Sequence, residues 1–132
     1  MIVCLWIWFI AGAIFTHAHG TIDDQDLIIE MLVVNVRAGD MERYLTIDNQ
    51  IWTSFLRQQD GFISKHNLLS THTTANNATE VYHIIEWQSY NQWKKIPSDQ
   101  LTKITAQFIQ AMGYAPDMKS LPNDDGFHLV QP

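Results

Sequence analysis

The alternation of hydrophobic and polar positions after residue 20 predicts strands and amphipathic helices in turn. Residues 27–36 (LIIEMLVVNV) are rich in β-branched side chains and too few for an amphipathic helix, so they predict a buried strand. Apolar residues then recur at spacings of three and four over residues 41–59, interrupted at Asp48, which predicts a helix of about four turns. Asp40 before this helix and Gly61 after it are suitable cap and stop residues.

The middle of the chain predicts a β-hairpin. Residues 62–69 and 81–87 have the composition of strands, and the polar stretch 70–79 (STHTTANNAT) between them predicts a loop. If the loop is symmetric about Thr74 and Ala75, residues whose numbers sum to 149 face each other across the hairpin. A shift of one residue in this register would turn every side chain of one strand to the other face.

A second helix and a last strand complete the predicted fold. After a short helical turn that holds Trp93, residues 98–112 place their apolar side chains on one face, with Ser98 as a candidate cap and Gly113 as the stop. An irregular stretch then precedes a predicted strand at residues 127–130. The order β-α-β-β-α-β is that of an α+β, ferredoxin-like domain, which has a four-stranded antiparallel sheet with both helices on one face.

Apolar residues occur on both faces of the predicted hairpin. One alternating set holds Phe62, Leu68, Val81, Ile85 and Trp87, and the other holds Ile63, Leu69, Tyr82 and Ile84. Because the helices cover one face only, the second face would expose a larger apolar patch than monomers usually carry. We therefore expect a homodimer in which two sheets pack face to face.

The first 20 residues differ in composition from the remaining 112. They contain no Lys, Arg, Asp or Glu, and residues 2–15 form an apolar run that suits a signal peptide and is short of the roughly 20 residues needed to cross a bilayer. Ala18 and Gly20 are small residues in the positions that precede a cleavage site. We expect residues 1–20 to be a signal peptide and residues 21–132 to be one domain.

This leader predicts a secreted protein, or one in the lumen of an exported compartment. An uncleaved anchor is the alternative, and the protein would contact a membrane only if residues 2–15 were retained. The net charge of −6, with only eight basic residues, argues against a nucleic-acid surface. Because Cys4 is the sole cysteine, residues 21–132 have no disulfide, zinc-thiolate site or cysteine nucleophile.

Two histidines are the sharpest candidates for chemistry. In the register above, His66 and His83 face each other with Cβ atoms about 5 Å apart, close enough to share a metal ion or a proton. The alternative is that both are partly exposed residues of the sheet. Zinc needs three or four ligands, and the spacing places no third one, although His128 lies on another predicted strand. We therefore predict no metal site.

Several short motifs resemble those of a known family. They are residues 51–53 (IWT), 61–65 (GFISK), 85–87 (IEW), 92–97 (QWKKIP), 107–108 and 112–113. In this order and spacing they are similar to an uncharacterised antibiotic-biosynthesis-monooxygenase-like family of the dimeric α+β-barrel superfamily, familiar from cyanobacteria and plastid-bearing lineages. The departures from the family's usual pattern are at His66, Asn67 and Leu68, and in the loop around Asn76.

The resemblance implies a dimer with a cavity between helices and sheet, where superfamily relatives bind planar polycyclic or haem ligands and some oxygenate them without a bound cofactor. Trp52, Trp87 and Trp93 would supply stacking surfaces there, and core packing is the alternative for all three. Haem degradation in related proteins uses an Asn, a Trp and a His. Asn35 and Trp93 could fill two of these roles, but residues 101–112 contain no histidine, which argues against that reaction.

Two functions from different classes stay open. The first is binding of a small hydrophobic ligand, with or without an oxygenation that needs no cofactor, in a cavity that the two histidines or Asn35 would line. The second is a non-catalytic interaction or structural module, which a cavity filled by Trp52, Trp93 and Phe108 would favour. We expect no bound cofactor and assign no catalytic residue.

Two further features belong to neither function. Glu30 and Glu86 lie on predicted strands and are general-base candidates if they are buried, with Lys65 as the candidate partner across the hairpin. Asn77 begins an Asn-x-Thr sequence in the predicted loop, which is a glycosylation site in an exported eukaryotic protein. In a bacterium it would be a coincidence of a loop rich in Thr and Asn.

Overall fold

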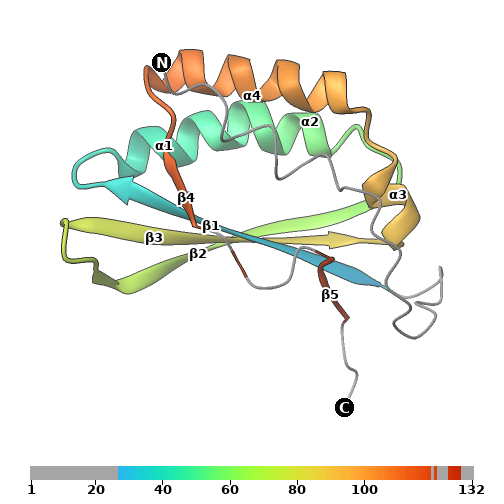
Figure 1. Cartoon of the computed structure of the whole chain (residues 1–132), viewed down its shortest axis with the longest axis horizontal. Helices are drawn as coiled ribbons and strands as arrows, with labels where there is room; N and C mark the ends of the chain where they lie inside the picture. The colour runs from blue at the N-terminus through green and yellow to red at the C-terminus, as the bar shows by residue number, and fades with distance from the viewer. Residues whose placement is uncertain (1–26, 120, 122–124, 129–132) are drawn as a thin grey trace.

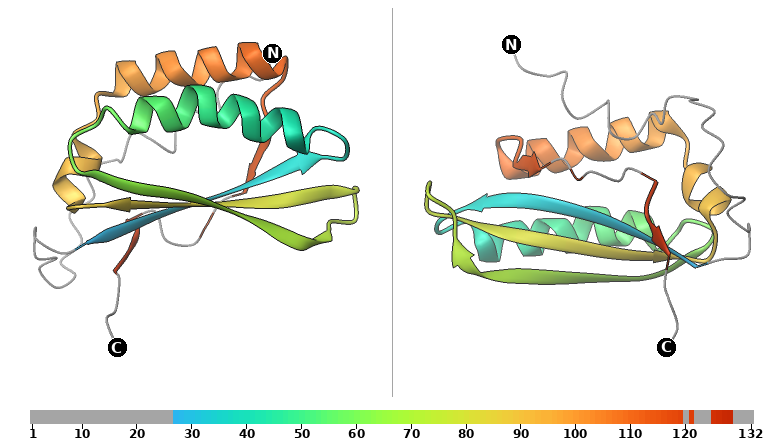
Figure 2. Two further views of the ribbon diagram at one scale, coloured as in Figure 1. Left: turned by 180° about the vertical axis from the view of Figure 1, so that it is seen from behind. Right: turned by 60° about the horizontal axis from the view of Figure 1, so that its bottom comes forward.

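A computed structural model describes residues 27–119, 121 and 125–128 of the chain. The strands form one antiparallel sheet in the order β2-β3-β1-β4, and β5 pairs with β1 as well. The helices cover one face of this sheet (Figure 1 and Figure 2). The elements are β1 (Ile28–Arg37), α1 (Met41–Asp48), the π-helical segment η1 (Asn49–Thr53), α2 (Ser54–Leu56), β2 (Phe62–Thr73), β3 (Ala78–Trp87), α3 (Tyr90–Lys94), α4 (Ser98–Met112), β4 (Asp117–Lys119) and β5 (Phe127–His128).

This element order and strand order confirm the predicted α+β, ferredoxin-like fold. The fourth strand position of the sheet differs in detail from the prediction, because two short strands, β4 and β5, share it. β4 pairs with residues 33–35 of β1, and β5 pairs with residues 28–29. The predicted last strand is therefore present at residues 127–128, while residues 129–130 lie outside the described part of the chain, as does the predicted leader. No helix among the described residues is long and apolar enough to cross a membrane.

The first predicted helix is confirmed, and it changes geometry at its one polar interruption. α1 ends at Asp48, and the chain continues through the π-helical turn η1 into α2. A π-helical turn inserts an extra residue into the helix and is frequent at functional sites. Asp48 itself is only 3% exposed, so the break in the apolar pattern is a buried carboxylate rather than a surface position.

The predicted hairpin is present, but its loop is shorter than expected. Strands β2 and β3 extend through most of the polar stretch 70–79 and leave a turn of four residues, 74–77. The turn is closed by hydrogen bonds from the Thr74 amide to the Ala78 carbonyl (2.7 Å) and from the Asn77 amide to the Thr74 carbonyl (2.9 Å). The prediction of a long loop was wrong because threonine is polar and yet β-branched, which suits an exposed strand.

The predicted hairpin register was also wrong, by one residue. The pairing is irregular between Phe62 and Ser64 and again between Leu69 and Thr73, and between these two places His66 faces Ile84 and His83 faces Asn67. Opposite residues of an antiparallel pair share a face, so His66 and His83 lie on opposite faces of the sheet. The same shift exchanges the predicted faces of Leu68 and Leu69 relative to β3.

The second long helix begins one residue earlier than a Ser98 cap would require. Ser98 is the first helical residue, Pro97 precedes it in an extended conformation, and no side chain caps this end. The fixed φ of proline is compatible with the position immediately before the helix. The predicted stop is confirmed, because Gly113 adopts the left-handed conformation with φ of 79° and donates its amide to the Ile109 carbonyl.

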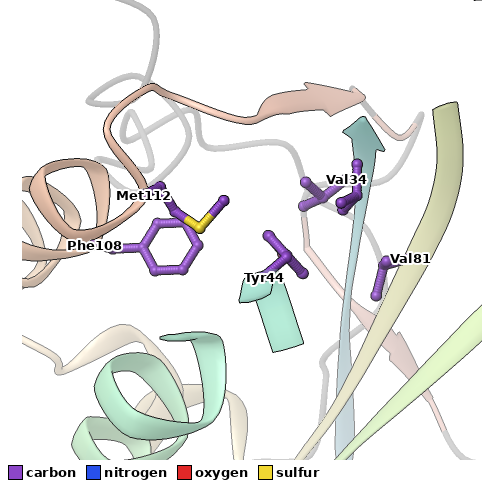
Figure 3. Packing of buried hydrophobic residues seen from close by; sticks show 6 residues of the cluster. Val34, Tyr44, Val81, Phe108 and Met112 are labelled. Carbon is purple, nitrogen blue, oxygen red and sulfur yellow. The ribbon is translucent and has the colours of Figure 1, made fainter. Parts of the chain in front are cut away.

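Two buried clusters join the helices to the sheet. In the first, Phe108 and Met112 of α4 approach Tyr44 of α1 above Val34 and Val81 of the sheet (Figure 3). The second cluster lies nearer α3 and consists of Ile28, Leu56, Ile85 and Trp87. Helices and sheet therefore meet through two separate apolar contacts, and residues of both clusters line the cavity described next.

Candidate functional site: a cavity between the helices and the sheet

A cavity of about 110 Å³ lies between the helical layer and the sheet. A single buried water needs only about 10–15 Å³ of such space, so this cavity has room for a small organic molecule. Most of its surface is apolar, and its titratable groups come from β1, β2, β3, α1 and α3. The lining residues are Glu30, Leu32, Val34, Tyr44, Asp48, Trp52, Leu56, Lys65, His83, Ile85, Trp93, Lys94, Ile96, Leu101, Phe108 and Met118.

The floor of the cavity is a set of rows across three strands. In one row Ile85 of β3 lies between Glu30 of β1 and Lys65 of β2. In the next row His83 lies between Leu32 and Asn67. Neighbouring strands are about 4.8 Å apart, so Glu30 and Lys65 start from backbones about 10 Å apart and both project toward the helices.

A chain of hydrogen bonds runs through the polar side of the cavity. Lys65 Nζ donates to Asp48 Oδ2 at 2.5 Å and to the Thr53 hydroxyl at 3.2 Å. Asn67 Nδ2 donates to the same Asp48 oxygen at 3.4 Å. On its other side, Asn67 Oδ1 lies 2.7 Å from His83 Nδ1. The Tyr44 hydroxyl lies 2.7 Å from His83 Nε2 and ends the chain.

The ionised Asp48 carboxylate fixes the direction of each of these bonds. A carboxylate only accepts hydrogen bonds, so Asn67 turns its amide nitrogen toward Asp48 and its oxygen toward His83. His83 must then donate from Nδ1. When the imidazole is neutral, Nε2 accepts from the Tyr44 hydroxyl, so the network selects one tautomer.

Burial shifts the pKa values of His83 and Tyr44 in the directions that favour their neutral forms. Burial of the imidazole lowers the pKa of His83 to about 4, with the Asp48 carboxylate opposing the effect. Burial, and next the charge of Asp48, raise the pKa of the Tyr44 hydroxyl well above its ordinary value. Both groups are consequently neutral at physiological pH and act as hydrogen-bonding groups rather than as charges.

Lys65 and Asp48 form a buried ion pair on the cavity wall. Their side chains are each 4% exposed. Burial lowers the pKa of the Lys65 ammonium, and the Asp48 carboxylate raises it. Removing either partner would leave a buried charge without compensation. Two of the three ammonium hydrogens are used by Asp48 and Thr53, which leaves one N–H that no described residue accepts.

Glu30 is the second carboxyl of the cavity. Trp87 Nε1 donates to Glu30 Oε2 at 2.9 Å, and no described residue donates to the other oxygen. Burial raises the pKa of the Glu30 carboxyl, while the Trp87 hydrogen bond and the charges of Lys94 and Lys65 oppose this rise. The free oxygen of Glu30 can therefore accept a hydrogen bond when ionised and donate one when protonated.

The structure brings together four of the seven predicted pocket residues. Trp52, His83, Trp93 and Phe108 line the cavity. Trp87 is fully buried behind it and contacts Glu30, so its role is to hold that carboxyl. His128, on β5, is exposed and is not one of the lining residues.

Two predicted pocket residues lie on the other face of the sheet. His66 is exposed there beside Ile84. Asn35 pairs with Asp117 of β4 and donates to its carboxylate at 3.0 Å, while its own side-chain oxygen is buried with no partner among the described residues. The two histidines therefore share no ligand, and no described group of three His, Cys, Asp or Glu residues is placed to hold a metal ion.

Sequence reasoning weighed Glu30 but missed Asp48 and Tyr44, and it gave Lys65 the wrong partner. Lys65 pairs with Asp48 rather than with a strand carboxylate, and Glu86 faces away from the helices, where it accepts from Ser64. The available signal was the interruption of the apolar stripe at Asp48, one turn after Tyr44 on the same helical face.

The candidate glycosylation residue Asn77 is exposed at the hairpin turn, with φ of 57°.

Fold and cavity together define a small α+β domain of ferredoxin-like topology with an internal site between its layers. No protein-family model matches the sequence, and a comparison with curated proteins gives no match. A comparison with solved structures gives a crystal structure from Bordetella bronchiseptica described as a candidate antibiotic biosynthesis monooxygenase. The two share 11% identical residues and a TM-score of 0.48, over 72% of this chain and 94% of that one. The fold stated above follows from the strand order and pairing of this chain alone.

Proposed function

We propose that this protein binds a small, largely apolar ligand of about one ring in the cavity between its helices and sheet. The observation that carries the proposal is the cavity itself, about 110 Å³ with a mostly apolar lining and a few polar groups on its floor and wall. An apolar cavity of roughly 150 Å³ in another protein binds benzene. Pockets that combine apolar walls with a few fixed polar groups are the usual form of small-molecule sites.

The polar groups support a ligand rather than a filled core. A core gains nothing from a buried ion pair and a buried carboxyl, which cost several kcal/mol to desolvate. Here Lys65 keeps one N–H without an acceptor and Glu30 keeps one oxygen without a donor, both beside the cavity. A bound molecule with polar atoms would satisfy both groups.

Filling the cavity tests this proposal. Leu101 of α4 lines the cavity and is almost fully buried, so Leu101→Trp would occupy the space that a ligand needs. We expect this change to weaken binding of benzyl alcohol by about tenfold or more, measured by saturation-transfer NMR. Ile63→Trp is the matched control, because Ile63 is 46% exposed and lies outside the cavity. Equal affinity of both variants for benzyl alcohol would contradict the proposal.

Oxygenation of the ligand without a cofactor is the chemistry that the resemblance suggests for such a site. It would need a base beside the ligand, because the ligand anion itself supplies the electrons that reduce O₂. Glu30 supports this second step, as a titratable carboxyl with a free oxygen in the cavity. Oxygen uptake with a phenol as the probe, lost in Glu30→Gln while binding persists, is the expected result. Uptake that survives Glu30→Gln would contradict it.

We also propose that the protein is a homodimer through the face of the sheet that the helices leave uncovered. Leu68 on this face is 56% exposed. The partly buried Tyr82 and Ile84 of β3 and Met31 of β1 lie on the same face. A second copy would remove these apolar side chains from water. The export of the protein remains a prediction from residues 1–20.

A further inference from the structure

The most informative part of the cavity is the row Glu30–Ile85–Lys65 on its floor. The two polar residues lie on either side of an apolar one, on the same face and at the same level of the sheet. Each retains one hydrogen-bonding position that no described residue uses, an N–H of Lys65 and an oxygen of Glu30. A ligand resting on Ile85 would have one group on each side of it.

The charges around this row favour an acid over an amine. Lys65 belongs to the floor, and Lys94 of α3 stands at the edge of the cavity with its ammonium 3.7 Å from the centre of the Trp93 ring. Both lysines act electrostatically on Glu30. Asp48 offsets the charge of Lys65 in their ion pair. A cationic ligand would therefore meet Lys94 as a like charge, whereas an anionic one would meet it as an opposite charge.

Glu30 is compatible with an anionic ligand when it carries a proton. Its Oε2 is occupied by the Trp87 N–H, so a proton on Glu30 lies on the free oxygen and makes that atom a donor. Lys65 and protonated Glu30 then offer two donors to one acid group. The burial that raises the pKa of the Glu30 carboxyl supports this state, and a bound anion would raise it further.

We propose that the ligand is a ring-sized weak acid, a carboxylate or a phenolate, whose acid group binds the free N–H of Lys65 and shares one proton with the free oxygen of Glu30. The proposal rests on the ligand-binding function above and names its chemical class. The reaction is a proton transfer alone: an ionised Glu30 takes the proton of the neutral acid, and the resulting anion stays on Lys65. No electron is moved and no bond to carbon changes.

The other charged and titratable groups that face this row leave the assignment unchanged. Asp48 accepts from Lys65 and Asn67 through Oδ2, and its charge is offset by that of Lys65. His83 and Tyr44 are neutral and bonded to each other. The proton shared with the ligand is therefore that of Glu30. As pH rises through the Glu30 pKa, the ionised carboxylate repels the ligand anion, and affinity for an acid falls.

Three probes with one ring and different charge test the proposal on the full chain. They are benzoate, benzyl alcohol and benzylamine, compared by isothermal titration calorimetry. We expect benzoate to bind about tenfold more tightly than benzylamine, the range of one charge-assisted hydrogen bond. Tightest binding by benzylamine would overturn the proposal, as would equal binding by all three. Binding by none of them, benzyl alcohol included, would instead overturn the ligand-binding function on which the proposal rests.

Two variants separate the roles of the two residues. Glu30→Gln keeps a donor in place of the protonated carboxyl, so benzoate should still bind, and its affinity should lose the decline with rising pH. The double change Lys65→Met, Asp48→Leu removes the ion pair without leaving an unpaired charge. It should reduce the affinity for benzoate about tenfold more than it reduces the affinity for benzyl alcohol. Retained pH dependence in Glu30→Gln, or equal losses for both probes in the double variant, would contradict the assignment.

Discussion

Asp48 holds the polar side of the cavity in place, because one of its oxygens accepts from both Lys65 and Asn67. Through Asn67 it also determines which nitrogen of His83 carries the proton, and so the direction of the bond to Tyr44. A single carboxylate thus sets the hydrogen bonding of Lys65 and Asn67 directly and that of His83 through Asn67. Its position at the end of α1, where the π-helical turn begins, aims it at the sheet.

Replacing Asp48 alone should be costly to the folded state. We expect Asp48→Asn to reduce the free energy of unfolding by about 3–5 kcal/mol, because the Lys65 ammonium then stays buried without a counter-charge. Urea denaturation followed by circular dichroism measures this. The control is Lys65→Met, Asp48→Leu, which should lie within about 2 kcal/mol of the wild type. A loss below about 0.5 kcal/mol for the single change, the range of exposed ion pairs, would show that the pair is solvated.

His83 should make stability depend on pH in a defined direction. Its folded pKa of about 4 lies below the ordinary value of 6.5, so between these values the unfolded chain binds the proton more readily. The contribution of His83 is complete above pH 6.5 and declines as pH falls toward about 4, by about 3 kcal/mol in all.

Comparison of the wild type with His83→Gln between pH 4 and pH 7 isolates this contribution. As pH falls, the unfolding free energy of the wild type should decrease relative to that of the variant. Glu30 works in the opposite direction, because its raised pKa favours the folded state at low pH, and it remains in both proteins, so it cancels. A difference that does not change with pH would contradict the neutral, buried imidazole.

Among the connections between elements, two glycines with positive φ distinguish the cost of backbone strain from the cost of a steric clash. Gly61 has φ of 83°, and a Cβ there would lie 2.6 Å from side-chain atoms of Gln92. Gly39 has φ of 85° and nothing within 4 Å of such a Cβ. Gly39→Ala should cost about 1 kcal/mol from backbone strain alone.

Gly61→Ala should therefore cost more than Gly39→Ala, by about 1 kcal/mol or more, because Gln92 must also move. Thermal and urea denaturation of the two variants give the comparison. Equal losses would mean that the turn between α2 and β2 does not pack against α3 as described.

The fold was predictable from the sequence because its signals are local. β-branched runs, a 3–4 periodicity and glycine stops define each element without reference to the others, and these elements have one common arrangement. The hairpin register was not predictable, since it depends on two irregularities in the pairing, between Phe62 and Ser64 and between Leu69 and Thr73, that interrupt the regular alternation. The pairing between them turns His66 away from the cavity.

The site was predictable in its aromatic residues and His83, but not in its ion pair. Trp52, Trp93 and Phe108 could be found from spacing and from the resemblance, whereas the Lys65–Asp48 pair joins a strand to a helix 17 residues earlier. The number of residues between Lys65 and Asp48 does not indicate that their side chains meet in the fold. The polar interruption of an apolar helix face at Asp48 was the one local sign, because a charged residue in such a stripe needs a buried partner.

At the scale of the whole molecule, the proposed dimer depends on which face each leucine of β2 presents. Leu68 pairs with Tyr82 on the uncovered face, and Leu69 pairs with Val81 on the helix side, with 56% and 50% of their surfaces exposed. We expect light scattering at micromolar concentration to give twice the mass of one chain for the wild type. Leu68→Lys should yield monomers, and Leu69→Lys, a change of equal chemistry on the other face, should remain dimeric. A monomeric wild type would contradict the dimer.

A titration with benzyl alcohol followed by two-dimensional ¹H–¹⁵N NMR shows whether the space between helices and sheet receives a ligand. The indole N–H signals of Trp52 and Trp93, which line the cavity, should shift as the ligand is added. The backbone amides of Ile63 and Leu68, outside the cavity, should not. Shifts confined to the uncovered face of the sheet, or no shifts at millimolar benzyl alcohol, would contradict the account.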